Sequence, residues 1–331
     1  MFAGSGTDSE GNPGSPIILL EEARGNKRQH CADLAENHKH VVFGFNEKEK
    51  EKRELLDKAT EDFLLKCKSA CPLEKCVYSN TIYCRDASFE EIMKSEKFRA
   101  VLANKSYAKF VLLDQYGFSQ ITKDVFLKLA TSPLTDFIFF ISSSFIKRFR
   151  DVDAVKTYID TNRLDFEKKK PKECHRIIAD YFRNLIPADK EYYIHHFTIQ
   201  KGANYYGLIF GTNHTLGMEK FVKVCWMEDE NSGESNCNID NDFEKGSLFY
   251  NPTNTTKKIK IKEELELLIL NGKIKSNIEG LKWVLSHGCE PKLFVDVAKS
   301  LVEKKKVKIQ GRFNRQSSNI HRVEEYKIEV L

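Results

Sequence analysis

Strand-like and helix-like segments alternate between residues 41 and 141, and this alternation constrains the fold more than any other feature of the chain. Apolar runs suited to strands lie at residues 41–45, 77–84, 110–113 and 137–141. Stretches with helical spacing follow them, at residues 47–66, 89–102 and 122–130. Such alternation is typical of a parallel, doubly wound sheet with helices on its faces. We therefore predict an α/β fold for this part of the chain.

The segments that follow extend this sheet. Residues 192–200 and 205–211 are two β-like runs around a short polar turn, which predicts an antiparallel hairpin. Residues 216–226 have helical spacing. The run at 137–141 is apolar at every position, so we expect a strand that is buried on both faces. Together these segments predict one domain over residues 1–226.

The C-terminal quarter has a different composition. Residues 227–256 are rich in Asn, Ser, Asp and Glu and are interpreted as a polar linker or loop insertion. Residues 257–331 then contain three helical stretches and two short strand-like runs around a polar loop. This order is typical of a winged helix-turn-helix domain. Residues 251–331 hold 17 Lys and Arg against 10 Asp and Glu, an excess that favours contact with nucleic acid.

The candidate nucleic-acid contacts lie on the third of these helices and on the loop after it. They are Lys292, Lys299, Lys304, Lys305, Lys306, Arg312, Arg315 and Arg322. Lysine and arginine at such positions contact phosphates and base edges. A lysine-rich surface that only keeps the protein soluble, or that contacts another protein, explains the same pattern.

The cysteine content and the lack of membrane signals suggest a compartment. The chain has nine cysteines at irregular spacing, which favours reduced thiols and a cytoplasmic protein. No apolar run approaches the roughly 20 residues that span a bilayer. Cys67, Cys71, Cys76 and Cys84 lie close in sequence, but their spacing does not match paired zinc ligands, so no metal is expected.

The N-terminal residues Phe2-Ala3-Gly4-Ser5-Gly6 form a glycine-rich string. The string resembles the loop after the first strand of class I S-adenosylmethionine-dependent methyltransferases, in a Rossmann-like sheet. There the glycines let the backbone approach the cofactor closely. The resemblance makes Phe2, Gly4 and Gly6 candidate cofactor-binding residues. It also implies a buried first strand before the loop, so we expect that the reading frame begins too late or that the chain is truncated and inactive.

Two acidic residues follow the next two predicted strands. Glu47 comes directly after residues 41–45, where such folds place a carboxylate that hydrogen-bonds the ribose hydroxyls. Asp86 follows residues 77–84, where methyltransferases contact the adenine amino group. A helix N-terminal glutamate explains Glu47 equally, and a helix-capping aspartate explains Asp86.

The strand predicted at residues 110–113 leads into the run Leu113-Asp114-Gln115-Tyr116-Gly117. Amino-methyltransferases that act on bases carry Asp or Asn, two prolines and an aromatic residue at this place. Asp114 could accept a hydrogen bond from the target amine and Tyr116 could stack on the base, which makes them the catalytic candidates. Both prolines are absent here, and an acidic residue and an aromatic that simply end a strand are the alternative. No Pro-Cys pair follows the strand, which disfavours methylation at carbon 5 of cytosine.

Taken together, these blocks resemble the three-Cys-motif partner protein family. The further matching stretches are residues 141–149, 205–210, 213–214 and 217–220, with Trp226. The resemblance implies a class I methyltransferase-like domain, a C-terminal winged helix and a separate partner with a three-cysteine motif. Family members usually have Asp-Pro-aromatic-Gly where this chain has Asp114-Gln115-Tyr116-Gly117.

The sequence therefore predicts an S-adenosylmethionine-dependent methyltransferase-like protein that acts on nucleic acid, with amino-group methylation among its reactions. Glycines 4 and 6, Glu47 and Asp86 would hold the cofactor, and catalysis would depend mainly on positioning. The alternative is a non-catalytic adaptor of the same fold that binds DNA or a three-Cys-motif protein. The replacement of proline by Gln115 favours this alternative.

Overall fold

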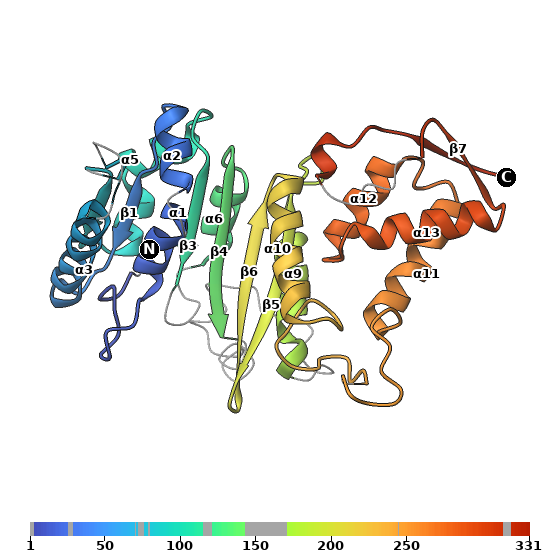
Figure 1. The fold of residues 1–331 in the computed structure, drawn as a ribbon, viewed down its shortest axis with the longest axis horizontal. Helices are drawn as coiled ribbons and strands as arrows, with labels where there is room; N and C mark the ends of the chain where they lie inside the picture. The colour runs from blue at the N-terminus through green and yellow to red at the C-terminus, as the bar shows by residue number, and fades with distance from the viewer. Residues whose placement is uncertain are drawn as a thin grey trace. The chain divides into compact units, whose positions relative to one another are not determined.

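The computed structural model shows a mixed α/β protein with parallel and antiparallel strand pairs (Figure 1). It describes residues 3–25, 29–69, 71, 76–78, 80–114, 121–142, 171–243, 245–313 and 319–331. The chain divides into two compact units. The first unit is Met1–Val101 with Leu112–Tyr116, and the second is Leu102–Val111 with Gly117–Leu331.

The first unit is built around a parallel strand pair, β1 (Phe43–Asn46) and β2 (Ile82–Arg85). Helix α3 (Lys50–Ser69) connects the two strands, as a crossover between parallel strands requires. The other helices are α1 (Ser15–Arg24), α2 (Gln29–Glu36), α4 (Phe89–Lys94) and α5 (Glu96–Ala103), whose last residues belong to the second unit. The buried core comes from α1, β1 and α3 and consists of Ile17, Leu20, Phe45, Leu56, Phe63 and Cys67.

The second unit contains most of a four-stranded sheet with the order β3-β4-β6-β5. Its strands are β3 (Lys109–Leu113), β4 (Thr135–Ser142), β5 (Tyr193–Lys201) and β6 (Asn204–Thr212). Strand β6 pairs antiparallel with both β4 and β5, which confirms the predicted hairpin. Among the described residues, three helices and a short 3₁₀ turn accompany it: α6 (Lys123–Ala130), η2 (Pro171–Glu173), α9 (Cys174–Arg183) and α10 (Thr215–Glu228).

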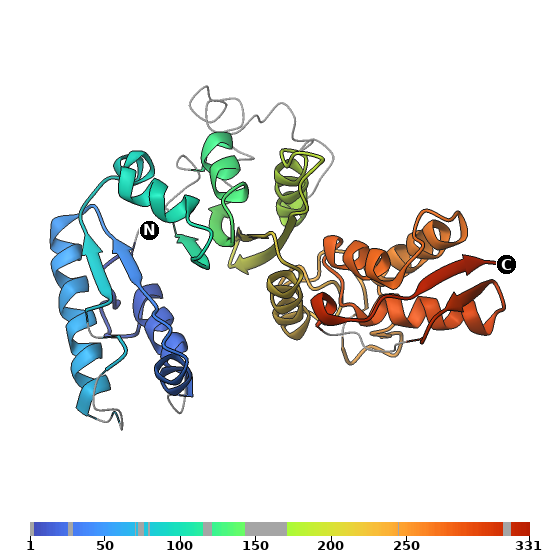
Figure 2. The same ribbon diagram turned by 90° about the horizontal axis from the view of Figure 1, so that it is seen from above.

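Aromatic residues fill both faces of this sheet. Helices α6 and α9 lie on one face and α10 on the other (Figure 2). On the first face, Phe126 of α6 contacts Phe137 edge to face, with ring centroids 5.8 Å apart. On the second face, Phe210 stacks on Phe221 of α10 at 4.5 Å. Strand β4 alternates buried and half-buried positions, and its half-buried Ile138 packs against the cluster that includes α10, so its apolar run is covered on both faces but to different degrees.

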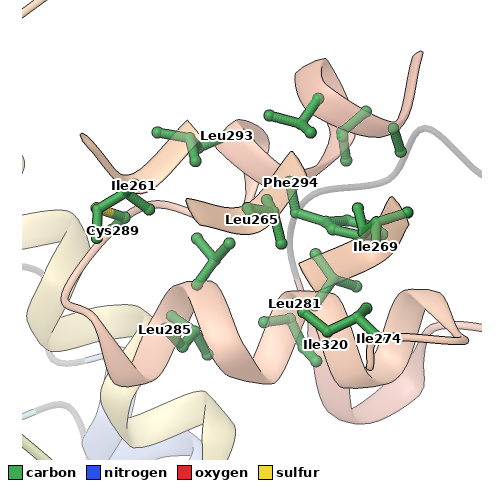
Figure 3. Packing of buried hydrophobic residues seen from close by; sticks show 14 of the residues in the cluster. Ile261, Leu265, Ile269, Ile274, Leu281, Leu285, Cys289, Leu293, Phe294 and Ile320 are labelled. Carbon is green, nitrogen blue, oxygen red and sulfur yellow. The ribbon is translucent and has the colours of Figure 1, made fainter. Parts of the chain in front are cut away.

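The C-terminal elements pack on the same core as α10. They are α11 (Thr256–Leu270), α12 (Asn277–Ser286), α13 (Lys292–Glu303), β7 (Val307–Gln310), η3 (Ile320–Arg322) and β8 (Lys327–Val330). Strands β7 and β8 are antiparallel, and Ser276 bridges to Lys327 of β8. Apolar side chains of the three helices gather between them (Figure 3). The same cluster includes Met218, Val222 and Trp226 of α10.

The compact units do not follow the predicted domain boundaries at residues 226 and 257. The segment expected to be a polar linker contains the buried residues Ser232, Glu234, Ser235 and Ile239. Its backbone pairs with β5, because Thr198 N–H donates to Glu234 O at 2.6 Å and Asn236 N–H donates to Thr198 O at 3.1 Å. This polar segment is therefore part of the packed second unit, which its composition alone does not reveal.

None of the helices in the described part of the chain is long and apolar enough to cross a bilayer.

Candidate functional site

The N-terminal glycine loop is attached to the carboxyl end of β1. Gly4 N–H donates to Glu47 Oε2 at 2.9 Å, and Ala3 N–H donates to Asn46 O at 2.8 Å. Gly4 and Gly6 have φ angles of +66° and +83°, a backbone region that favours glycine. The structure therefore brings together two of the residues predicted from the sequence, Gly4 and Glu47.

The carboxyl ends of β1 and β2 are fixed to each other. Glu47 N–H donates to Arg85 O at 2.9 Å. The buried Asn46 side chain donates to Ala87 O at 2.9 Å and accepts from Ala87 N–H at 3.2 Å. Because Asn46 lies opposite Arg85 in the register, Glu47 and Asp86 each follow the last paired position of their strands. Both carboxylates thus belong to the edge of a parallel sheet where ligands of such folds bind.

Asp86 is exposed and does not cap the helix after it. The N-cap of α4 is Ser88, whose hydroxyl accepts from Glu91 N–H while the Glu91 carboxylate accepts from Ser88 N–H. This capping box excludes the capping interpretation of Asp86. Glu47 retains part of its structural alternative, because its Oε1 also accepts from Glu49 N–H at 3.1 Å, one residue before α3.

Asp114 follows β3 and is connected to the same loop. Its Oδ2 accepts from Ser15 Oγ at 3.3 Å, at the N-terminus of α1. Gly14, directly before Ser15, donates its N–H to Gly6 O at 2.8 Å. A chain of contacts in the first unit therefore runs from Asp114 through Ser15 and the glycine loop to Glu47.

The two glycines of the loop have different surroundings. A Cβ built on Gly6 would lie 2.9 Å from Ala59 Cβ and 3.2 Å from Leu56 Cδ1 of α3. A Cβ built on Gly4 would meet no atom within 4 Å. Gly6 is thus required for packing against α3, whereas the loop is open at Gly4. Phe2, Tyr116 and Arg315 lie outside the described residues.

The predicted basic residues that the structure describes are exposed but differ in their pairing. Lys299 lies 3.7 Å from Glu303, and Lys306 lies 3.1 Å from Glu266. Within the described ranges, the others have no ion-pair partner; they are Lys292, Lys304, Lys305, Arg312 and Arg322.

The outward side of α13 carries charges of both signs. Its exposed positions are Lys292, Asp296, Lys299 and Glu303. These side chains sum to no net charge, which is a poor match to a phosphate backbone. Of the predicted basic residues without an ion-pair partner in the described ranges, Lys292 lies on α13, and Lys304, Lys305, Arg312 and Arg322 lie after it.

The densest charge cluster of the second unit was not predicted from the sequence. Glu234 is buried, and its carboxylate contacts Arg176 and, at 2.6 Å, Lys257 Nζ. Arg176 also forms a two-pronged pair with Asp240, each bond 2.7 Å long. Burial would raise the pKa of Glu234, but the charges of Lys257 and Arg176 outweigh it and hold this pKa well below its usual range. In the sequence, Glu234 is a glutamate inside a polar segment and cannot be told from a solvated surface glutamate. No sequence signal could therefore have found this cluster.

Three histidines near this cluster are buried and neutral. Burial lowers the pKa of His175 and of His195 to about 3, and the pKa of His196 falls well below its ordinary value for the same reason. His195 Nε2 contacts Gly233 O at 3.1 Å, and His175 Nδ1 contacts Thr198 Oγ1 at 3.0 Å. These contacts give His195 and His175 a role in fixing the chain inside the second unit.

His214 is the N-cap of α10, and its Nδ1 accepts from Leu216 N–H at 3.1 Å. In the described part of the chain, no three His, Cys, Asp or Glu side chains are grouped to hold a metal ion.

Comparison of the chain with protein-family models, with curated proteins and with solved structures finds no match.

Proposed function

We propose that the first unit binds S-adenosylmethionine at the carboxyl ends of β1 and β2, in a Rossmann-like methyltransferase domain. The observation that carries the proposal is the 2.9 Å hydrogen bond from Gly4 N–H to the Glu47 carboxylate. It joins a glycine loop to an acidic residue at the end of a parallel strand. Nucleoside cofactors bind to doubly wound folds with this pair of features.

The residues at this edge fit such a cofactor. A carboxylate has about four acceptor sites, and Glu47 uses its two oxygens for Gly4 and Glu49 N–H, which leaves capacity for two ribose hydroxyls. The open space beside Gly4 lets a ligand approach the loop backbone. The exposed Asp86 carboxylate, one position beyond β2, can accept from an adenine amino group.

The cofactor supplies a methyl group already activated on a sulfonium centre. The chain then has only to bind the cofactor and align the acceptor. Asp114, exposed and held by Ser15, would accept a hydrogen bond from the acceptor amine and orient it. Tyr116 would stack on the base, and the acceptor class we propose is nucleic acid.

Isothermal titration of the full chain with S-adenosylmethionine tests the cofactor site. We expect saturable binding, and Glu47→Ala should weaken it by about 10- to 100-fold because charge-assisted hydrogen bonds to the ribose are lost. Glu49→Ala is the matched control. It removes the same charge two residues away from Glu47, and the Glu49 side chain is exposed and pairs with Lys52. Absence of binding at about 1 mM cofactor would refute the proposal.

We further propose that the C-terminal elements form a winged helix that grips the nucleic acid through residues 304–312. Lys304, Lys305 and Arg312 lie in this stretch and have no ion-pair partner in the described ranges, which supports this assignment. The mixed charges of α13 argue against insertion of that helix into a groove of the nucleic acid. Such binding would be largely independent of base sequence and sensitive to salt.

Binding of DNA and RNA over a range of salt concentrations tests this second part. Lys304→Gln with Lys305→Gln should weaken binding and lower the slope of affinity against salt by about 1–2 charges. Lys292→Gln with Lys299→Gln removes the same charge from α13 and should change binding less. The reverse order would contradict the assignment.

The alternating charges of α13 favour one other function, a non-catalytic adaptor of the same fold that contacts a protein. A methyl-transfer assay on mixed DNA and RNA separates the two. Transfer that is lost in Asp114→Ala supports the enzyme. Cofactor binding without transfer, together with salt-insensitive nucleic-acid binding, supports the adaptor.

A further inference from the structure

Helix α10 begins at a side chain that can cap it only while that side chain is neutral. The N-cap is His214, whose Nδ1 accepts a hydrogen bond from Leu216 N–H at 3.1 Å. A ring nitrogen that accepts a hydrogen bond carries no proton, and a protonated histidine has a donor on each nitrogen and no acceptor. Protonation of His214 therefore removes this cap. It also places a positive charge at the positive end of the helix dipole.

The 3₁₀ turn η3 contacts the same end of α10. The ring of His321 meets the ring of His214 edge to face, with centroids 5.3 Å apart. The Glu219 carboxylate of α10 accepts from Asn319 N–H at 2.8 Å and from Ile320 N–H at 3.3 Å. Ile320 is buried in the core that α10 shares with the C-terminal helices. Two histidine rings and one carboxylate thus hold the start of η3 against α10.

The Asp136 carboxylate of β4 also lies against the first turn of α10. A Cβ built on Gly217, in that turn, would lie 3.2 Å from Asp136 Oδ2 and 2.8 Å from Thr212 Oγ1. Burial raises the pKa of Asp136, while its hydrogen bond with Thr212 and the positive charge that His214 can carry oppose the rise. Asp136 is therefore a carboxylate that attracts a protonated His214.

A second carboxylate near His214 is Glu191, two residues before β5. Its Oε2 lies 2.7 Å from Lys282 Nζ of α12, and its Oε1 accepts from the Tyr193 hydroxyl at 2.6 Å. Burial would raise the pKa of Glu191, but the hydrogen bonds from Lys282 and Tyr193 outweigh it, and His214 acts in the same direction. Because Lys282 already balances the charge of Glu191, Asp136 is the stronger attraction for a protonated His214.

We propose that His214 is a pH-dependent latch between α10 and η3. When neutral, His214 caps α10 and its ring packs against His321. When protonated, its ring leaves Leu216 N–H and turns toward Asp136, so η3 loses one of its contacts with α10. Protonation of His321 as well would make the two rings repel each other. Histidine ordinarily changes its charge between about pH 5 and pH 8, so the latch is closed above this range and open below it.

The latch goes beyond the proposed function. Arg322, one of the predicted basic residues, lies within η3 and would gain mobility when the latch opens. Neither the residues of the cofactor site nor residues 304–312 take part in the latch. Its test is therefore separate from the tests of cofactor and nucleic-acid binding.

Hydrogen exchange of the full chain at about pH 7.5 and about pH 5.5 tests the latch, with labelling times corrected for the intrinsic effect of pH on exchange. We expect the protection of the Leu216, Asn319 and Ile320 amides to fall by about 5- to 30-fold at the lower pH, because loss of a helix cap has an effect of this size. Amides in the middle of β5 and β6 should change little, which separates local opening from a general loss of stability.

Two variants show whether His214 is the group responsible. Asparagine caps a helix through its side-chain oxygen at either pH, so His214→Asn should retain protection at both. His287→Gln is the matched control. The Nδ1 of His287 lies 2.7 Å from Trp283 O, which can only accept, so this nitrogen already carries a proton and its contact survives protonation of the ring. This variant should keep the pH dependence of the wild-type chain.

Three results would overturn the proposal. One is equal protection of the three amides at the two pH values, and another is a pH-dependent loss that persists in His214→Asn. The third is a loss of the same size in β5 and β6. If His214→Asn does not fold, NMR of the wild-type chain decides, because the Leu216 amide signal must shift with the same midpoint as the His214 ring signals.

Discussion

The two units use their charged residues in opposite ways. In the first unit, Glu47, Asp86 and Asp114 lie at strand ends with their carboxylates half-buried or exposed. In the second unit, Glu234 and Lys257 are each 8% exposed or less and pair with each other inside the protein. The first arrangement leaves oxygens for a ligand, whereas the second uses its charges to fix the chain. Burial, not residue type, separates a candidate site from a structural cluster.

The difference extends to the apolar cores. The core of the first unit comes from α1, β1 and α3 and includes one cysteine, Cys67. The core of the second unit continues from the sheet through α10 into α11, α12 and α13. Both tryptophans of the chain, Trp226 and Trp283, belong to the second unit. Tryptophan fluorescence therefore reports on the second unit alone, and each unit can be followed separately.

The largest expected effect comes from breaking the Glu234 cluster. Glu234→Ala leaves Lys257 and Arg176 without their shared carboxylate, and loss of one partner of a buried ion pair costs about 3–5 kcal/mol. Urea unfolding followed by tryptophan fluorescence should show this loss. Glu230→Ala is the control, because its ion pair with Lys245 is exposed and is expected to contribute less than about 1 kcal/mol. Equal effects of the two substitutions would mean that burial does not separate the clusters.

The second-largest expected effect is a destabilisation of the second unit by acid. His175 and His195 have a folded pKa of about 3 against an ordinary 6.5, so the unfolded chain takes up protons first as the pH falls. This contribution to stability is complete above pH 6.5 and is lost as the pH falls from there toward 3. The depressed pKa of Glu234 acts in the same direction below 4.5. Urea midpoints from tryptophan fluorescence should fall steadily from pH 7 to pH 4, and constant midpoints would contradict buried, neutral histidines.

The smallest expected effects distinguish the two glycines of the N-terminal loop. Gly6→Ala adds a Cβ 2.9 Å from Ala59 Cβ at a positive φ and should destabilise the first unit by about 1–3 kcal/mol. Gly4→Ala meets no neighbour, so only the left-handed backbone costs energy, about 1 kcal/mol. Hydrogen exchange of α3 amides measures the difference. A larger loss for Gly4→Ala would show that the open side of the loop is occupied.

Pattern alone located most elements of the chain. The hairpin β5-β6, helix α10 and the order of the C-terminal elements follow from hydrophobic spacing, which reflects which face of each element is buried. The pairing of Gly4 with Glu47 also agrees with the sequence, because both were expected at the carboxyl end of parallel strands. Local spacing determines the helices and strands, so the sequence predicts them.

Other features depend on contacts between segments that are distant in sequence. Glu234 meets Arg176 and Lys257 across 58 and 23 positions, and nothing in residues 227–256 distinguishes a buried glutamate from a solvated one.

The sequence by itself determined the α/β character, the positions of most helices and strands, and the acidic residues at the strand ends. Only the tertiary structure decided where the chain divides into units, that the polar segment is buried against β5, and that Ser88 rather than Asp86 caps α4. The physical reason is that periodicity records whether a residue faces a core. It does not record which distant partner satisfies a buried charge or hydrogen bond.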